Sequence, residues 1–380
     1  MLPRERVQAA FEHRPADKVP VYQAGFSSYA GSIVLGREAY TGGGIQQYRE
    51  GRALWDGPDA HAEYLERSRQ DACDICEVLD LDLIRPSYWR MPEKPTRRID
   101  ANTFVYGDEA GSNWRIMQFN PATELYQISA RAPQPEPTIA DLERSLAGDP
   151  PSPDSHRPTR DSYPDLTAAI ERFPNRACPG YGSGLCIPRE PIWLEACALR
   201  PDLVGKHLDR QVAYVPGSVA VMAELGLKYV CGGGDFAGPL GPMYSPKVFH
   251  DLMLPRLQQI SEICHAAGCY HGFASDGNLW PVAADLFGAS GVDFFYELDR
   301  RAGMDLKRMR QTFPDVTLWG GINSETLHIG TVEEVRVQTL TALEAAQEFT
   351  SIVVGCSNQL VIGTPPENIE IMLETMREHR

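Results

Sequence analysis

The chain has 380 residues, of which 43% are hydrophobic and 23% charged, and this globular composition excludes global disorder. Its 51 acidic residues outnumber 36 basic ones, giving a formal net charge of −15, and we therefore expect no nucleic-acid partner. No apolar run approaches the ~20 residues that cross a bilayer. The charged amino-terminal stretch has no signal-peptide core, and nine irregularly spaced cysteines favour reduced thiols. We expect a soluble cytoplasmic protein without membrane contact.

Short apolar runs separated by helical stretches dominate the chain, and we interpret them as β-strands. There are eight, at residues 19–26, 79–86, 177–184, 227–234, 268–275, 292–299, 316–323 and 351–358. Strand–helix alternation predicts parallel strands joined by right-handed crossovers. Eight such units predict an α/β fold of the TIM (β/α)8 barrel type rather than an open sheet. We expect residues 1–380 to form a single domain.

Residues 91–164 interrupt this rhythm after the second strand. The alternating stretch 96–119 surrounds the turn-like sequence DEAGSN and predicts an antiparallel β-hairpin. A proline-rich polar segment follows, with a short helix in IADLERSLAG. We expect this insertion to lie at the catalytic end of the barrel, either as a lid or as a covering flap without a gating role.

Acidic residues stand at the ends of three predicted strands, where such barrels carry their chemistry. Asp235 follows the fourth strand, Asp276 follows the fifth and Glu297 ends the sixth. A plainer interpretation exists for each: the two aspartates adjoin glycines and suit turns or helix caps. Glu297 has Arg300 and Arg301 nearby as ion-pair partners. Around one pocket the three carboxylates would repel one another, raising a pKa or attracting a cation.

Polar residues at other strand ends complete the candidate site. They are Gln23, Arg85, Asn278, Asn323, Cys356 and Asn358. Cys356 is either a small buried residue or a reactive thiol. Strand alternation places His271 on the face opposite Asp276, toward the helices, and predicts a structural histidine.

Five segments resemble members of the uroporphyrinogen decarboxylase family. They are RERVQAAFEHRPADKVPV, GGGDFAGPLGPMYSPKVFHDLMLPRL, SDGNLWPVAADLFGASGVDFFYELDRRAGMDL, GGINSETLHIGTVEEV and GCSNQLVIGTPPENI. They occur in the family's order and span nearly the whole chain. The resemblance implies a TIM barrel with one of two activities. One is the haem-pathway decarboxylase, and the other is methyl transfer between a small substrate and the cobalt of a corrinoid carried on a separate protein.

The resemblance weighs against the haem-pathway decarboxylase. That enzyme carries Arg-Gln-Ala-Gly-Arg on its first strand, where the arginines hold substrate carboxylates, whereas this chain has Tyr22 and Phe26 at the arginine positions. The aspartate that follows the decarboxylase's second strand is also missing from residues 84–89. Since an octacarboxylate needs a cationic lining, we expect a methyltransferase-type member. It would move a methyl group from a small methylated or methoxylated substrate to a corrinoid.

The resemblance leaves the metal open. Methyltransferases of the family bind zinc through a His-x-Cys on the fifth strand and a late cysteine, and these positions are Ala274, Asp276 and Cys356 here. One hypothesis is therefore a zinc site of Asp276, Glu297 and Cys356. The other is a metal-free pocket whose carboxylates transfer protons. Nothing resembles a corrinoid-carrying module, so a corrinoid would arrive on a partner protein.

Aromatic side chains are expected to line the substrate pocket and to suit an apolar or aromatic ligand; they are Tyr22, Phe26, Tyr88 and Trp89. In the expected methyl transfer, Asp276 or Asp235 protonates the leaving oxygen. Two alternatives remain. One is a decarboxylase or other lyase on a smaller acid, held by Arg85 or Arg90. The other is a ligand-binding barrel without catalysis.

Overall fold

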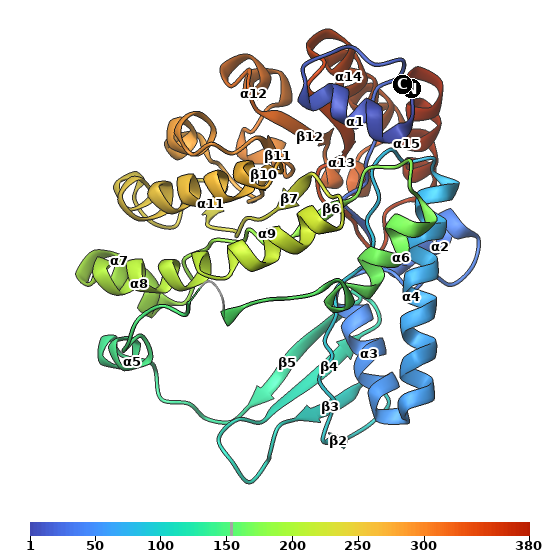
Figure 1. The fold of residues 1–380 in the computed structure, drawn as a ribbon. Coiled ribbons are helices and arrows are strands. Elements are labelled where there is room, and N and C mark those ends of the chain that lie inside the picture. Colours follow the sequence, from blue (N-terminus) through green and yellow to red (C-terminus); the bar gives the residue numbers. More distant parts are fainter. Residues whose placement is uncertain (153–154) are drawn as a thin grey trace.

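The computed structural model describes residues 1–152 and 155–380 (Figure 1). Its centre is a six-stranded parallel sheet in the order β13–β12–β11–β10–β7–β6. The strands are β6 (Pro179–Tyr181), β7 (Tyr229–Cys231), β10 (Tyr270–Phe273), β11 (Phe294–Phe295), β12 (Thr317–Ile322) and β13 (Ile352–Cys356). Each lies inside one of the predicted runs, which confirms the α/β class and the parallel arrangement of the last six runs.

The first two predicted strands join this sheet through isolated bridges. Val21 bridges Val354 of β13, and Leu83 bridges Ala177 just before β6, both in parallel. The N–H of Asp82 donates to the carbonyl of Val21 at 3.1 Å, so the two segments also contact each other. A short parallel pair follows, made by β1 (Gly25–Phe26) and β14 (Gln359–Leu360). The structure therefore shows a six-stranded half-barrel with two irregular segments across its open side.

Helices form the outer layer, and a large apolar cluster fills the space between them and the sheet. The longer ones are α2 (Ser28–Leu35), α3 (Gly44–Asp56), α4 (Pro58–Val78), α6 (Pro164–Arg172), α7 (Pro191–Leu199), α8 (Pro201–Val212), α9 (Val215–Glu224), α11 (Leu254–Ala266), α12 (Leu306–Thr312), α13 (Ser324–Ile329), α14 (Val332–Phe349) and α15 (Pro366–His379). Shorter turns are η2 (Arg160–Ser162), α10 (Pro246–Val248), η3 (Phe249–Met253), η4 (Trp280–Val282), η5 (Ala284–Ala289) and η6 (Arg300–Ala302).

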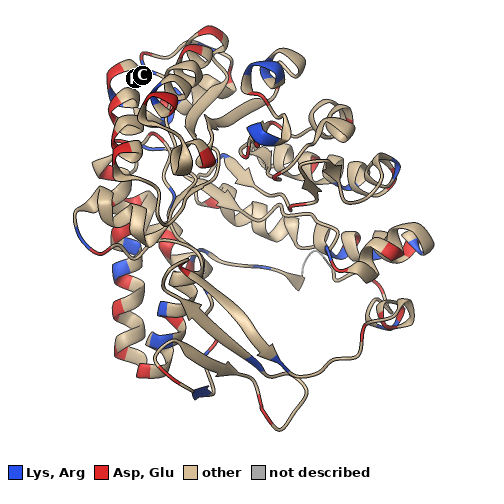
Figure 2. Cartoon of the chain, turned by 180° about the vertical axis from the view of Figure 1, so that it is seen from behind, with Lys and Arg blue, Asp and Glu red and all other residues tan. Residues whose placement is uncertain are grey.

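Local capping fixes where several helices begin. Thr331 and Glu334 form a reciprocal capping box at the start of α14, where each side chain accepts the other residue's backbone N–H. Acidic and basic residues are interspersed along the outer helices (Figure 2). Among the described residues, no helix has the length and apolarity needed to cross a membrane.

The helix α1 (Pro3–Phe11) closes the amino-terminal end of the sheet. Its Phe11 ring lies 4.6 Å from the rings of Tyr229 and Tyr270 and 5.3 Å from Phe294, between centroids. These partners are the first residues of their strands. Since parallel strands share one direction, their carboxyl ends face the opposite side, away from α1 (Figure 1).

The insertion 91–164 forms a four-stranded antiparallel sheet, larger than the predicted hairpin. Its strands are β2 (Arg97–Arg98), β3 (Thr103–Tyr106), β4 (Arg115–Asn120) and β5 (Leu125–Arg131), and β3 and β4 flank DEAGSN as predicted. The predicted helix is α5 (Ile139–Ser145). Residues 153–154 of the insertion lie outside the described residues. The assignment of residues 1–380 to one domain stays a prediction, as does the choice between lid and flap.

The carboxylate of Glu124 fastens this sheet to the barrel. It accepts the backbone N–H groups of Ser28 and Tyr29, both at 2.8 Å, at the start of α2. A carboxylate is stabilised there because the first N–H groups of a helix have no partner within it. The sheet lies beside α3, on the side of the molecule opposite α1 (Figure 1).

Candidate active site

The three predicted catalytic carboxylates meet at the carboxyl ends of neighbouring strands. The backbone N–H of Asp276, after β10, donates to Oδ1 of Asp235, after β7, at 3.3 Å. The side-chain amide of Asn358, after β13, lies 3.3 Å from both carboxylate oxygens of Asp276. The same amide nitrogen lies 3.5 Å from Oε1 of Glu297, after β11. Asn358 therefore bridges two acids that would otherwise only repel.

A fourth acid, Asp299, belongs to this group. Its Oδ2 accepts the N–H of Gly277 at 3.2 Å, and its Oδ1 accepts the N–H of Ala302 at 3.2 Å, which caps η6. Sequence reasoning did not select Asp299. Its position two residues after Glu297, at the end of the same predicted strand, was the available signal. We call Asp235, Asp276, Glu297, Asp299 and Asn358 the carboxylate cluster.

The carboxylate cluster favours protonated acids. Burial, reinforced by the negative charges of Asp276 and Asp235, raises the pKa of Glu297 to about 8, and Arg85 opposes this shift. Burial also raises the pKa of Asp276, helped by Asp235 and Asp299 and opposed by the hydrogen bond from Asn358. A carboxyl group with a pKa near 8 carries its proton at neutral pH and is able to donate it.

Arg85 lies among phenol side chains of the barrel interior. Its Nη1 donates to the carbonyl of Ala24, its Nε donates to the carbonyl of Ser87 at 3.1 Å, and its Cζ is 5.1 Å from the centre of the Tyr88 ring. Electrostatic interactions also join it to Tyr22, Tyr181, Tyr296 and Glu297. The structure thus places the predicted residues Tyr22 and Tyr88 around Arg85, which itself interacts with Glu297 of the carboxylate cluster.

Two tyrosines near Arg85 were missed by sequence reasoning. The Tyr296 hydroxyl donates to the carbonyl of Gly232, and burial raises the pKa of its phenol well above 10. Tyr181 ends β6 and is 46% exposed. Tyr296 directly precedes Glu297, whereas Tyr181 lies in the third predicted strand, which supplied no candidate residue, so position alone was the signal. Their phenols stay protonated at neutral pH and present hydroxyl groups.

Two predicted substrate-binding residues lie elsewhere. Gln23 faces α15: its Oε1 accepts the N–H of Cys356 at 3.1 Å, and its Nε2 lies 3.6 Å from the sulfur of Met376. Phe26 is 1% exposed and packs in the apolar layer between sheet and helices. The segment between the Val21 bridge and β1 is not a regular strand. The alternation of side chains between the two faces of a strand therefore does not predict which way Gln23 and Phe26 point.

The remaining predicted contacts are local. Trp89 is exposed and lies beside Gly43, before α3. Asn278 Oδ1 accepts the N–H of Trp280 at 3.1 Å. Asn323 caps α13, since its Oδ1 accepts the N–H of Glu325 at 2.8 Å. These three side chains do not join the carboxylate cluster through any hydrogen bond among the described residues.

The predicted zinc ligands do not converge. Cys356 shares a face of β13 with Ile352 and Val354, which pack toward the helices, while Val353 packs with the barrel interior. Burial raises the pKa of the Cys356 thiol to about 12. Within residues 1–152 and 155–380, no three His, Cys, Asp or Glu side chains are placed to hold a metal ion. Asp276, Glu297 and Cys356 therefore do not fit a zinc site.

The predicted orientation of His271 is confirmed. Its Nδ1 lies 2.8 Å from the hydroxyl of Ser261 on α11, and the residue is fully buried. Tyr270, one residue earlier, packs with the barrel interior instead. Burial lowers the pKa of His271 to about 3, so the ring is neutral and structural.

The chain is similar to known proteins in part of its sequence and in its fold. Residues 234–379 match the family model described as uroporphyrinogen decarboxylase (URO-D). No curated protein matches the chain in sequence. A solved "methyltransferase from Methanosarcina mazei" superimposes with a TM-score of 0.61 at 17% identity, over 100% of this chain and 99% of that one. A "D-tagatose 3-epimerase-like protein" reaches a TM-score of 0.35 at 12% identity, over 58% of this chain and 85% of that one.

Proposed function

We propose that the chain, whose residues 234–379 match the uroporphyrinogen decarboxylase family model, is a methyltransferase-type member of that family. Its substrate is a small methoxylated or methylated compound, and the methyl group passes to a corrinoid on a partner protein. The solved methyltransferase that shares this fold over the whole chain supports the proposal. The observation that carries it is the position of the Glu297 carboxyl group within the carboxylate cluster, 3.5 Å from the Asn358 amide, where burial raises its pKa to about 8.

We also infer that the eight segments close into a complete (β/α)8 barrel. Three contacts across the open side of the half-barrel support this. The N–H of Tyr22 donates to Val354 at 2.9 Å, that of Asp82 donates to Val21 at 3.1 Å, and that of Ile84 donates to Ala177 at 2.9 Å. A closed barrel gathers the carboxylate cluster and Arg85 at one mouth.

The proposed reaction uses Glu297 as its general acid. When the C–O bond of a methoxy group breaks, its electron pair stays on oxygen, and Glu297 donates a proton there to give a hydroxyl product. The corrinoid would supply the acceptor of the methyl group. The negative charges of Asp276 and Asp235 disfavour the charged form of Glu297. The side-chain amide of Asn358 positions Asp276 and Glu297 relative to each other. The pKa of Glu297, raised to about 8, suits it to the role of proton donor.

A lyase acting on a small carboxylic acid is the second candidate, and Arg85 is the observation that favours it. A guanidinium surrounded by phenols suits a substrate carboxylate. Glu297 would then supply the proton that replaces CO2. Release of CO2 without methyl transfer would favour this candidate. Binding without turnover would favour a ligand-binding barrel.

The test measures methyl transfer from methoxylated aromatic compounds to free cob(I)alamin. The change in absorbance of the cobalamin reports the rate of transfer. Loss of a general acid costs roughly 10²–10⁴-fold, so we expect Glu297→Gln to lower kcat by that factor. Glu325→Gln is the matched control. Glu325 lies on α13, outside the carboxylate cluster, and forms an ion pair with Arg301 of η6. Equal rates for both variants would contradict the role of Glu297.

The pH profile gives a second readout. Since the acid form of Glu297 is required, kcat should fall as pH rises through about 8. Asp276→Asn removes a neighbouring negative charge, lowers the pKa of Glu297 and should move this limb to lower pH. If the fall of kcat occurs at the same pH in Asp276→Asn as in the wild type, a group other than Glu297 titrates there.

A further inference from the structure

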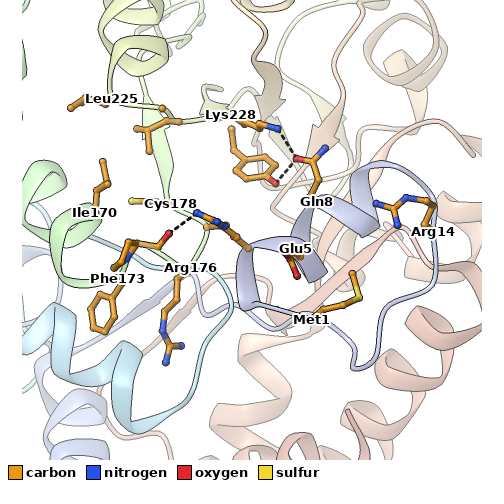
Figure 3. Close-up of a pocket in the computed structure, with 16 residues that line it drawn as sticks. Met1, Glu5, Gln8, Arg14, Ile170, Phe173, Arg176, Cys178, Leu225 and Lys228 are labelled. Carbon is orange, nitrogen blue, oxygen red and sulfur yellow. Dashed lines mark hydrogen bonds between the residues drawn. The ribbon is translucent and has the colours of Figure 1, made fainter.

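A pocket lies at the amino-terminal end of the sheet, beside α1 (Figure 3). It has a volume of about 760 Å³, which lies in the ~300–1,000 Å³ range of small-molecule sites. Its walls come from α1, the end of α6 and the segment that leads into β7. The side chains that carry the argument are Arg4, Ile170, Phe173, Leu225 and Lys228.

One wall of this pocket is apolar. Ile170, Phe173 and Leu225 are half-buried and pack against the main apolar cluster with one side. Leu227 and Cys178 lie deeper and are buried. The other side of the three half-buried residues remains open to the pocket, so an apolar body would gain contact area there.

The hydrogen bonds of two cations beside this wall go to neutral oxygens, and Lys228 also interacts electrostatically with the Glu12 carboxylate. Nη1 of Arg4 donates to the carbonyl of Pro174 at 2.9 Å, and Nζ of Lys228 donates to Oε1 of Gln8 at 3.4 Å. Within the part of the chain that the structure describes, neither forms an ion pair within 4.0 Å. By contrast, Arg14 pairs with Glu12 and Arg176 pairs with Asp80.

The charge of the pocket is therefore opposite to that of the chain. The lining contains Arg4, Arg14, Arg176 and Lys228 against one acid, Glu5, whereas the chain has a net charge of −15. The Glu5 carboxylate already accepts the N–H of Leu2 at 2.8 Å. An excess of cations over acids concentrates an anion in such a concave site.

We propose that this pocket binds a small amphipathic carboxylate. The carboxylate group lies toward Arg4 and Lys228, and the apolar body lies on Ile170, Phe173 and Leu225. This site is separate from the proposed reaction, because its lining includes Tyr229 at the start of β7, whereas Asp235 of the carboxylate cluster follows the other end of that strand. The proposal holds whether or not the protein transfers methyl groups.

Isothermal titration of the full chain with octanoate tests the site. We expect saturable binding of one octanoate per chain, with octan-1-ol and octylammonium binding at least ~10-fold more weakly, because each lacks the anionic group. The Arg4→Gln/Lys228→Gln double variant should raise the Kd for octanoate by ~10-fold or more. Leu225→Ser should also weaken binding, through the apolar wall.

Lys247→Gln is the matched control, since Lys247 is an exposed lysine on α10 that pairs with Asp251 outside the pocket. It should bind octanoate like the wild type. Thermal unfolding checks that each variant is folded, and the exposed positions of Arg4 and Lys228 favour this. Equal octanoate affinity in the wild type and the double variant would overturn the proposal, as would no binding at about 10 mM octanoate.

Discussion

Glu297 keeps its proton in the folded protein at a pH where an ordinary glutamate has lost it. The pKa rises from 4.5 to about 8 on folding, so between these values the folded state binds more protons than the unfolded state. The free energy of unfolding therefore falls as pH rises through this window, by up to about 1.4 kcal/mol per pH unit from this group. Below pH 4.5 both states are protonated and the effect vanishes.

This linkage predicts that Glu297→Gln is more stable than the wild type at pH 8 and similar to it at pH 4.5. Glutamine keeps the shape of the protonated acid and cannot ionise. Urea unfolding at both pH values measures the difference, and Glu325→Gln should show no such pH-dependent gain. A constant difference at both pH values would mean that Glu297 ionises normally in the folded protein.

The role of Cys356, as a buried packing residue or as a metal ligand, is also testable. Its side chain is 1% exposed, in the apolar layer, with a raised thiol pKa. We predict that Cys356→Ala costs about 1 kcal/mol of stability, as for removal of a small buried group, and leaves turnover unchanged. Chemical denaturation and the methyl-transfer assay measure the two effects. Loss of activity together with loss of bound zinc would restore the metal-ligand hypothesis.

Strand alternation predicted some of these side chains and not others. It predicted His271 because residues around it form a regular strand, β10, with Tyr270 inward and His271 outward. It gave no guide at Phe26, where the strand is interrupted. The contacts made by Asn358 and Asp299 depend on how loops after different strands approach one another, which no local pattern encodes.

At the scale of elements, all eight predicted runs contain the segments that pair in the structure. The last six form strands of the main sheet, whereas the first two reach that sheet only through bridges at Val21 and Leu83, and the first also contains β1, which pairs with β14. Pro20 and Pro86 lie in these two runs and have no N–H to donate to a ladder, which limits their length. The strand β5 was not predicted, although Tyr126, Ile128 and Ala130 alternate with polar residues in its sequence. Only Tyr126 of this strand is buried.

The helix α1 is the element whose contribution is easiest to test. Phe11 is 7% exposed and contacts aromatic rings from three strands. We predict that Phe11→Ala lowers the free energy of unfolding by roughly 3–5 kcal/mol, because it leaves a cavity at the closed end of the sheet. Ile329→Ala, at a 70% exposed position on α13, should change it by less than about 0.5 kcal/mol. Denaturant unfolding compares the two.

At the scale of the whole molecule, the two ends of the sheet differ in charge and in chemistry. Carboxylates gather where the strands end, and cations line the pocket where they begin. The overall charge of −15 predicts neither feature, because acidic and basic residues are interspersed over the outer helices (Figure 2). The choice of substrate therefore depends on the local groups at each end of the sheet and not on the net charge of the chain.

We predict no detectable conversion of uroporphyrinogen, an octacarboxylate, to coproporphyrinogen. Tyr22 packs on Trp319 at 5.3 Å between ring centres, and Phe26 is buried outside the barrel, so neither position offers a cation. Losing two charge-assisted contacts of roughly 1.5–3 kcal/mol each weakens binding by orders of magnitude. The cluster acids Asp235 and Asp276 would repel the substrate further. Chromatography of the porphyrins formed, beside an authentic decarboxylase, measures this; turnover at a comparable rate would reject the exclusion of the haem-pathway activity.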